Sequence, residues 1–488
     1  MRWLLIFILM LGMSLSGLAQ EDDSVIPPSP EEIQKDRNFY NGNTYNGLLP
    51  ALEEPAGEYL LLEDCLRMAY FNHPNLKSDV QGVVAAEAKL RIVDASYLPT
   101  FALTVDNTQE ADPSISRDTT VELGVSHTIW DTGQRGKQAA AARADLRAAI
   151  RQFQTTWIGQ VQTVVSAYIT LLEAEYLKQI QEDDVKRTRL NYDVAKAFYT
   201  TGVKSMIDVT TAEIQMSQAR VDLATAENSV RTARIALAQA IGVDVAELEG
   251  RPLEDLLMRE AAVPNRSDAL AYLEEFHPSL TGLSDQAESS FATAEAARRS
   301  NAPILTGSAY YGNGGVVFPQ SPIWQVELTL TFPFYTPSAG PTGDASEAEG
   351  QQFLAEREAQ QLLLIQQLDT AISDIQGAKE RADRAVEAVQ QALTNGDLAF
   401  RRYKFGLSEI TELINARSFI ESSRNELVKA LSDMKSAEAS FIQAMGHIPL
   451  PPGVPEDSPF LQLNLSEGKT RKEALKKAVP HRPGPNKR

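Results

Sequence analysis

The stretch that decides the fold is Phe400-Arg-Arg-Tyr-Lys-Phe-Gly-Leu-Ser-Glu-Ile-Thr-Glu-Leu-Ile-Asn-Ala-Arg417, in which two long helical patterns meet at a short turn around Gly406. A second stretch, Ala197-Phe-Tyr-Thr-Thr-Gly-Val-Lys-Ser-Met-Ile-Asp-Val-Thr-Thr-Ala-Glu213, has the same plan around Gly202, 204 residues earlier. Glycine is the usual residue just past a helix end, because it adopts a left-handed backbone without steric penalty. The sequence therefore predicts two hairpins of long helices.

Other landmarks repeat at the same spacing. The pairs 204 residues apart are Pro74 and Pro278, Pro99 and Pro303, and Gly242 and Gly446. A fixed internal spacing is the signature of a duplicated unit. We expect a first repeat over residues 59–242 with its tip at about 199–204, and a second over 267–446 with its tip at about 403–408. A linker at 243–266 would join them.

The segments outside the repeats have different compositions. Residues 1–19 have one basic residue, a short apolar run and small residues before Ala19, which predicts a secretory signal peptide. Residues 20–58 are rich in Pro, Asn, Gly and acids and are expected to be irregular, and the tail 447–488 is expected to be partly disordered. The single cysteine, Cys65, excludes an internal disulfide.

Charge and residue spacing exclude several functions. The net charge of −19 argues against nucleic acid as a partner, because such binding depends on Lys and Arg neutralising phosphates. The five histidines lack metal-ligand spacing, and no nucleophile–base set appears, so we expect no metal, no cofactor and no enzyme. His73 and His277 are interpreted as structural residues at helix starts, Asp183-Asp184 as part of a solvated helix face, and Gly312–Gly315 as a loop.

Alternating apolar residues follow Pro99 and Pro303 and predict two pairs of strands, at about 100–130 and 304–334. The apolar positions that share a face are Val121, Leu123, Val125 and Ile129 in the first pair and Trp324, Val326, Leu328 and Leu330 in the second. Polar loops near Asp106–Asp118 and Gly312–Pro322 would join the strands of each pair. This pattern is typical of membrane β-strands, although a half-exposed soluble sheet shows the same alternation.

A membrane location would require several copies of the chain. No apolar run after the predicted signal peptide is long enough for a membrane helix, so strands would have to cross the bilayer. Membrane barrels begin at about eight strands, and an open edge in lipid costs several kcal/mol for each unpaired backbone group. Four strands per chain therefore predict an oligomer, and three copies would contribute twelve strands.

A long helix follows each strand pair, at about 134–198 and 345–403. In the second helix, apolar residues recur every seven positions, at Leu368, Ile375, Ala382 and Val389. This repeat predicts coiled-coil packing. At 1.5 Å per residue the helix at 134–198 would be roughly 98 Å long. The helices expected at 74–97 and 205–241 together give about 92 Å, so stacked end to end they would match it.

Several short motifs, in this order and spacing, resemble those of the TolC family of outer-membrane efflux proteins over roughly residues 58–449. They are Asn72-His-Pro-Asn-Leu76, Ala95-Ser-Tyr-Leu-Pro-Thr100, Ile129-Trp-Asp-Thr-Gly-Gln-Arg135 and the Tyr-x-x-Gly tips. The resemblance implies a homotrimer with a twelve-stranded barrel in the outer-membrane lipid of a Gram-negative bacterium and an α-helical tunnel in the periplasm. It also implies a passive exit duct for tripartite efflux or type I secretion. A periplasmic adaptor would open the tip, and an inner-membrane transporter would supply the energy.

The resemblance also implies two sites at the tip. Adaptor docking would involve Gly202, Val203, Gly406, Leu407 and Ser408. The periplasmic gate would involve Asp208, Tyr403, Glu412 and Asn415. Ser408 stands where the family pattern has arginine, and Asn415 where it has aspartate, so only Glu412 keeps an acidic-ring position.

We hypothesise that three Glu412 side chains face one another across a narrow entrance. The alternative is that Glu412 lies exposed on the outer face of its helix. A second reading of the whole chain is a secreted periplasmic coiled-coil scaffold with a small soluble sheet. The sequence does not identify the cargo as drug, metal ion or polypeptide.

Overall fold

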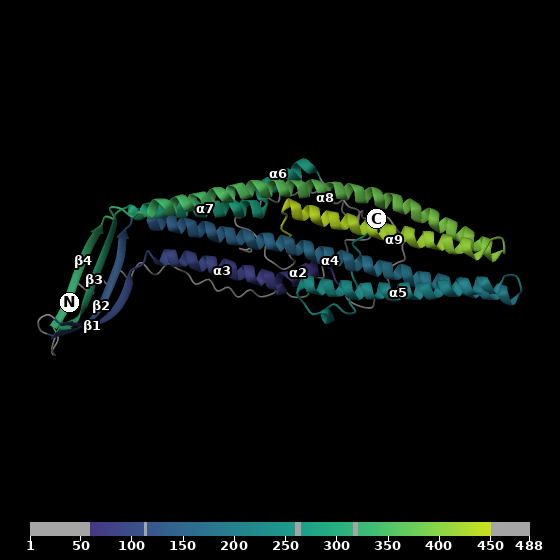
Figure 1. Cartoon of the computed structure of the whole chain (residues 1–488), viewed down its shortest axis with the longest axis horizontal. Helices are drawn as coiled ribbons and strands as arrows, with labels where there is room; N and C mark the ends of the chain where they lie inside the picture. The colour runs from purple at the N-terminus through teal and green to yellow at the C-terminus, as the bar shows by residue number, and fades with distance from the viewer. Residues whose placement is uncertain (1–58, 112–114, 259–264, 316–320, 450–488) are drawn as a thin grey trace, which may run out of the picture. The chain divides into compact units, whose positions relative to one another are not determined.

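The computed structural model of the protein describes residues 59–111, 115–258, 265–315 and 321–449, all within one compact unit, Gly42–Pro483. The predicted signal peptide, the irregular segment 20–58 and the tail beyond residue 449 lie outside the described residues. The described chain is mainly helical with one four-stranded sheet (Figure 1), which confirms that part of the predicted fold class. Within these residues, no helix is both long and apolar enough to cross a membrane.

The elements follow the predicted order closely. The first half contains α2 (Leu62–Asn72), α3 (Pro74–Ala95), β1 (Thr100–Ala111), β2 (Ile115–Trp130), α4 (Gln134–Thr200), α5 (Met206–Ile241) and the short 3-10 helix η1 (Val245–Glu247). The second half contains α6 (Arg266–Phe276), α7 (Pro278–Arg298), the 3-10 helix η2 (Arg299–Asn301), β3 (Ile304–Gly315), β4 (Ser321–Thr331), α8 (Ala339–Lys404) and α9 (Ile410–Met445).

Two long helical hairpins form the body of the molecule. Helix α4 packs against α5, and α8 packs against α9, while α4 also contacts α7 and α9 (Figure 1). The predicted seven-residue repeat of α8 is buried at every position, including Leu368, Ile375 and Val389. The repeat therefore marks the face on which α8 packs, as expected for coiled-coil helices.

The shorter helices meet end to end beside the long ones. Helix α5 ends at Gly242, where an added Cβ would lie 3.1 Å from the Cα of His73, the N-cap of α3. Helix α9 ends at Gly446, where an added Cβ would lie 3.1 Å from the Cα of His277, the N-cap of α7. The end-to-end stacking predicted from helix lengths is therefore observed at both junctions.

Both histidines cap helices. His73 Nδ1 accepts a hydrogen bond from the backbone N–H of Asn75 at 3.3 Å, and His277 Nδ1 accepts one from Ser279 at 3.2 Å. Each ring thereby satisfies one of the backbone donors that a helix N-terminus leaves unpaired. The interpretation of both residues as structural is confirmed.

The largest core cluster among the described residues includes residues of α4 and of the linker. Tyr168 is buried on α4, and its hydroxyl donates to the carbonyl oxygens of Leu60, at 2.9 Å, and Glu254, at 3.0 Å. Leu60 and Leu253 also form a parallel bridge. One buried tyrosine thus holds the linker and the chain before α2 to the same point of the long helix.

The sheet has the order β1-β2-β3-β4 and is antiparallel throughout. The strands are longer than expected, because β1 continues to Ala111 and β3 to Gly315. The prediction that Gly312–Gly315 forms a loop is wrong, since these residues pair with Thr119–Glu122 in β2. An added Cβ at Gly312 would lie 2.2 Å from the carbonyl oxygen of Val121, so glycine permits a close approach of the two backbones.

The interpretation of Asp183-Asp184 as a solvated helix face is wrong for Asp184. Its side chain is buried and accepts hydrogen bonds from Nε and Nη2 of Arg417 on α9. Arg417 Nη1 also donates to Gln215 Oε1 on α5 at 2.9 Å. The buried pair therefore links the first hairpin to the second, a partnership 233 residues apart that local sequence does not reveal.

Candidate functional site

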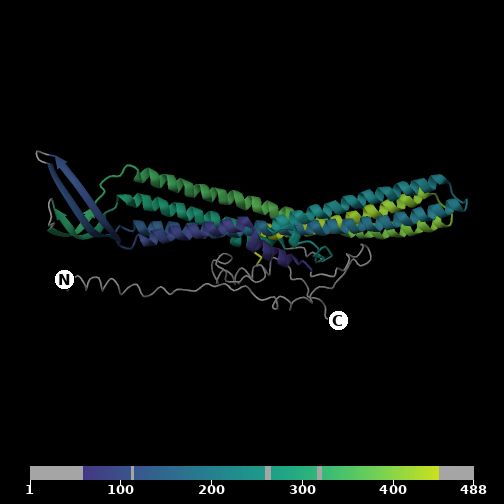
Figure 2. The ribbon, with the colours of Figure 1, turned by 90° about the horizontal axis from the view of Figure 1, so that it is seen from below.

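The sheet and the hairpin tips lie at opposite ends of the long helices, and both views agree on this (Figures 1 and 2). The strands gather at one end. The turn joining α4 to α5 and the turn joining α8 to α9 lie together at the other end. The predicted barrel residues and the predicted tip residues therefore form two separate candidate sites.

One face of the sheet is apolar across all four strands. Along one row, Leu103 pairs with Leu123, Leu123 with Tyr311, and Tyr311 with Trp324. A second row runs from Phe101 through Val125 and Ala309 to Val326. Because strand residues alternate between faces, this register brings the apolar positions predicted from both halves onto a single surface.

This apolar face is exposed in the single chain. The exposed fraction is 73% for Trp324 and 69% for both Val326 and Leu328. The other predicted positions, Val121, Leu123, Ile129 and Leu330, are also exposed, and Val125 is half-buried. Contiguous exposed apolar surface on a protein marks a site of contact with lipid or another protein.

The opposite face of the sheet is polar and internally hydrogen-bonded. Tyr310 donates its hydroxyl to Gln325 Oε1 at 3.0 Å, and Gln325 donates to Glu327 at 3.1 Å. Within the described part of the chain, the outer strands β1 and β4 each pair with one neighbour. The sheet therefore has an apolar face, a polar face and two edges with unpaired backbone groups.

Both tips end their long helices in the same way. In the first, the N–H of Val203 donates to Phe198 at 2.9 Å, and that of Gly202 donates to Tyr199 at 3.0 Å. In the second, Leu407 and Gly406 make the equivalent bonds, both at 2.9 Å. The φ angles of +75° and +72° at the two glycines complete a Schellman motif in each tip.

The predicted docking residues form an open surface. Val203 and Leu407 are 58% and 71% exposed, and an added Cβ at either tip glycine would meet nothing within 4 Å. Ser408 differs, because it is buried and its hydroxyl has no hydrogen-bond partner among the residues that the structure describes. Ser408 thus contributes to the interior of the tip, whereas the other four residues lie at its surface.

Lys204 joins the two tips, which sequence reasoning missed. Its Nζ donates to the carbonyl oxygen of Ser408 at 3.0 Å and lies 5.7 Å from the ring centroid of Tyr403. Phe198 packs edge-on against the same ring with centroids 5.7 Å apart. The expected arginine is absent at position 408, and a cation from the first tip binds that backbone instead. Because the contact is to a main-chain oxygen, no side-chain pattern at position 408 could signal it.

Asp208 and Tyr403, two predicted gate residues, interact without a hydrogen bond. Tyr403 is fully buried, and its hydroxyl has no partner in the described residues. Burial and then the negative charge of Asp208 raise the pKa of Tyr403 to about 12. Within one chain the tyrosine is therefore a neutral packing residue near an acid.

The other two predicted gate residues lie on the first turns of α9. Glu412 is 42% exposed at its side chain and accepts a hydrogen bond from Arg402 Nη1 at 2.7 Å. Asn415 is exposed. Arg402 belongs to the last turn of α8, so this ion pair connects the two helices of the second hairpin, α8 and α9, beside the turn that joins them.

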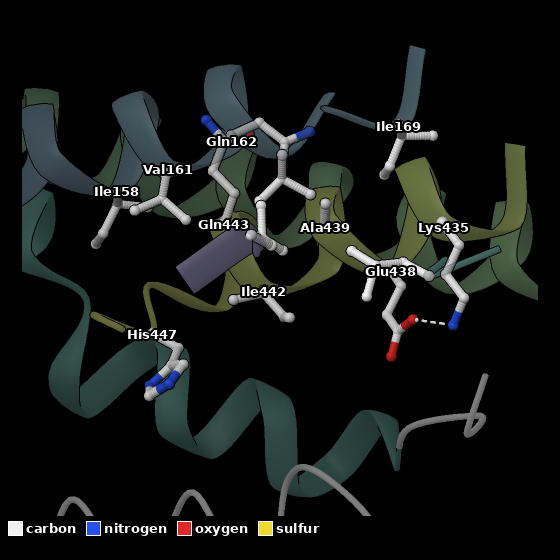
Figure 3. Close-up of a pocket in the computed structure, with 13 residues that line it drawn as sticks. Ile158, Val161, Gln162, Ile169, Lys435, Glu438, Ala439, Ile442, Gln443 and His447 are labelled. Carbon is white, nitrogen blue, oxygen red and sulfur yellow. Dashed lines mark hydrogen bonds and ion pairs between the residues drawn. The ribbon is translucent and has the colours of Figure 1, made fainter. Parts of the chain in front are cut away.

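A cavity of about 180 Å³ lies far from both ends, between α4 and α9 (Figure 3). Apolar side chains such as Ile158, Val161 and Ile442 make most of its wall. Lys435 lines it and forms an ion pair with Glu438 at 3.0 Å. Among the described residues, no group of three or more His, Cys, Asp or Glu side chains could hold a metal ion.

The comparisons with known proteins agree with this arrangement. The family model described as outer membrane efflux protein matches residues 65–243 and 273–447. These ranges cover well over half of the sequence, and the chain belongs to the outer membrane efflux protein family. The resemblance to the TolC family is thereby confirmed, and the family is one of outer-membrane efflux channels rather than of enzymes.

Curated relatives match over most of their length. Protein CyaE of Bordetella pertussis is 23% identical over 409 residues, covering 80% of this chain and 84% of the relative. The probable efflux pump outer membrane protein TtgC of Pseudomonas putida is 20% identical over 453 residues, covering 88% and 93%.

Solved structures share the fold. The CmeC outer membrane channel of Campylobacter jejuni aligns with a TM-score of 0.71 at 14% identity, covering 89% of this chain and 99% of CmeC. The MtrE outer membrane channel of Neisseria gonorrhoeae, solved in its open state, aligns with a TM-score of 0.67 at 18% identity, covering 88% and 97%. At these identities the likeness establishes the fold alone.

Proposed function

We propose that three copies of this chain assemble into a passive exit duct, with twelve strands forming a barrel in the outer membrane and the helical hairpins forming a tunnel in the periplasm. The chain would contain two copies of one structural unit, at residues 59–242 and 267–446. The matched Schellman turns and the matched helix junctions at Gly242 and Gly446 support the duplication.

The observation that carries this proposal is the four-stranded sheet with one exposed apolar face and two unpaired edges. An isolated sheet of this kind would leave edge N–H and C=O groups without partners in lipid, at several kcal/mol each. Pairing β4 of one copy with β1 of the next would satisfy these groups and place the apolar face toward lipid. The polar face, with Gln325 and Glu327, would then line the interior.

The experiment is to express the full chain in a Gram-negative host, fractionate the envelope and measure the mass of the purified protein. We expect recovery from the outer membrane only with detergent, a trimeric mass, and ion conductance in planar bilayers. A soluble monomer from the periplasm would contradict the proposal and favour a secreted scaffold.

We further propose that the two tips dock a periplasmic adaptor, which couples the duct to an inner-membrane transporter. The exposed Val203 and Leu407 beside the open glycine turns Gly202 and Gly406 support this, together with Ser408 behind them. The variants Val203→Asp and Leu407→Asp should abolish co-purification of the adaptor. Ile235→Asp, at an equally exposed apolar residue on α5, is the matched control. Equal loss with all three variants would contradict docking at the tips.

At the entrance, we propose that Glu412 contributes a ring of three carboxylates, with Asn415 a turn further in and Asp208 and Tyr403 holding the hairpins together. Confined like charges raise the cost of full ionisation and attract cations. Arg402 partly offsets each carboxylate through its 2.7 Å ion pair. In single-channel recordings, Glu412→Gln should lower cation selectivity and divalent-ion block, and Arg402→Gln should raise both. Unchanged selectivity in both variants would refute the ring.

A further inference from the structure

A second cavity, of about 520 Å³, lies between the two hairpins on the tip side of the molecule. Side chains from α4 of the first hairpin and from α8 and α9 of the second line this cavity. Its apolar part includes Leu393, Phe400 and Ile420. Its polar part includes Arg187 and Arg424, which the proposed duct function does not use.

Arg424 is the unusual residue of this cavity. It is only 7% exposed, and its Nε has no hydrogen-bond partner in the described residues. Its one ion pair is long, with Nη1 lying 3.5 Å from Asp183 Oδ2. A buried guanidinium with an unused N–H is costly, because the group has lost its water without gaining a full set of acceptors.

The charges around Arg424 leave it undercompensated. Burial, followed by the like charge of Arg187, lowers its pKa, and the carboxylate of Asp183 opposes this only in part. Asp183 is also shared with Lys186 at 3.7 Å. The guanidinium of Arg424 and the ammonium of Lys186 thus share the carboxylate of Asp183, while Arg187 adds a further positive charge to the lining.

The remaining acidic residues of the lining have partners of their own. Asp184 is held by Arg417 in a two-point pair. Glu421 accepts from Gln181 at 2.9 Å, and Asp397 pairs with Arg401 at 2.8 Å. The ion pairs of these three carboxylates with described residues are to Arg417 and Arg401, and none is to Arg187.

We infer that this cavity binds a small divalent oxyanion, such as inorganic phosphate, between Arg424 and Arg187. A tetrahedral oxyanion offers acceptors for the guanidinium groups of Arg424 and Arg187, which both line the cavity, and arginine recognises such oxyanions with paired N–H donors. The bound anion would bridge α9 and α4 and so hold the two hairpins together. This inference goes beyond the proposed duct function and does not require the trimer.

The test is calorimetric titration of inorganic phosphate into the purified full chain at pH 7.5 and constant ionic strength, with chloride and acetate as monovalent comparisons. We expect saturable binding of phosphate, weaker binding of the monovalent anions, and a melting temperature that rises with phosphate, because a ligand that binds only the folded state stabilises it. Titration heats without saturation would overturn the inference.

Single-residue variants test whether phosphate binds at Arg187 and Arg424. Arg187 is exposed, so Arg187→Gln leaves the fold intact, and we expect it to weaken phosphate affinity about tenfold or more through one lost charge-assisted bond. Arg424→Gln should have at least as large an effect. Arg189→Gln, at an exposed arginine of α4 outside the cavity lining, is the matched control and should bind as the wild type does. Equal affinity in the Arg187→Gln and Arg189→Gln proteins would refute the site.

Discussion

At the scale of single residues, glycines decide where the helices can stop and meet. Gly446 combines a φ of +75° with a neighbour 3.1 Å from its would-be Cβ, the Cα of His277. Gly242 meets the same two demands beside His73. At the tips only the backbone demand applies, since the space around Gly202 and Gly406 is open. The helix junctions are therefore more constrained than the tips.

Replacing Gly446 should be strongly destabilising. A left-handed backbone costs a non-glycine residue roughly 1–2 kcal/mol, and displacing His277 adds to that cost in Gly446→Ala. Gly159→Ala, in the interior of α4 with nothing near its would-be Cβ, should instead stabilise by up to about 1 kcal/mol. Thermal melting of both variants measures the difference. Equal melting temperatures would show that the junction tolerates a side chain.

Because of His73, we expect the folded protein to lose stability on mild acidification. Burial lowers its pKa below the ordinary value of 6.5. The unfolded chain therefore binds the proton more readily, so this residue's contribution is present above pH 6.5 and is lost as the pH falls below it. His73→Asn keeps a capping acceptor but cannot titrate. From pH 7.5 to pH 5.5, we expect the melting temperature of the wild type to fall further than that of this variant. An equal fall in both proteins would contradict the prediction.

At the scale of elements, several specific polar contacts join the two hairpins. Arg417 on α9 reaches α4 through Asp184 and α5 through Gln215. Lys204 provides a second link at the tip, to the backbone of Ser408. The large core cluster contains buried residues of both hairpins, among them Leu171 of α4 and Leu431 of α9. Near the tips, a smaller apolar cluster contains Ala195, Ala212 and Tyr403. Apolar packing therefore holds the hairpins together, and polar pairs fix their alignment.

Breaking the Asp184–Arg417 pair on one side should cost about 3–5 kcal/mol, because the remaining charge is left buried without its partner. The variant Asp184→Asn tests this, and the double variant Asp184→Leu with Arg417→Met should recover most of the loss. Asp397→Asn, which breaks an exposed pair with Arg401, is the control and should change stability by less than about 1 kcal/mol. Chemical denaturation measures all three. If Asp184→Asn is as stable as the double variant, Asp184 and Arg417 are not energetically coupled and the prediction is wrong.

At the scale of the whole molecule, the two candidate sites lie at opposite ends of the long helices. The sheet carries an apolar surface and open edges, while the tips carry exposed turns and charged residues (Figure 2). The helices between them set the distance, because α4 and α8 each run from the sheet to a tip without interruption. A duct that receives cargo at one end and releases it through a barrel at the other requires this separation.

The proposed lipid-facing role of the sheet predicts a contrast between its two faces. Leu328→Arg would place a charge on the apolar face, at a cost of about 2–4 kcal/mol if that position lies near the middle of the bilayer. Thr329→Arg places the same charge on the opposite face and should be tolerated. The measurement is the amount of each variant recovered from the outer-membrane fraction. Equal recovery would count against a lipid-facing surface.

The sequence by itself determined the order of the elements, the two hairpins and the alternating strands. These features follow from local periods of seven and two residues and from glycines and prolines at helix ends, all of which act over a few residues. The glycine-rich segment Gly312–Gly315 is an exception, because local sequence predicts a loop there. Only the partner strand β2 shows that close backbone and side-chain neighbours of Gly312 and Gly314 require glycine in a strand.

The tertiary structure alone decided which charges meet. Asp184 finds Arg417 across 233 residues, and Lys204 binds the backbone of Ser408 across 204. The stretch Phe400–Arg417 contains one residue of each contact, Arg417 and Ser408, yet its own sequence indicates neither contact. Such pairs depend on how two hairpins align side by side, and alignment is fixed by packing between distant segments rather than by any local period.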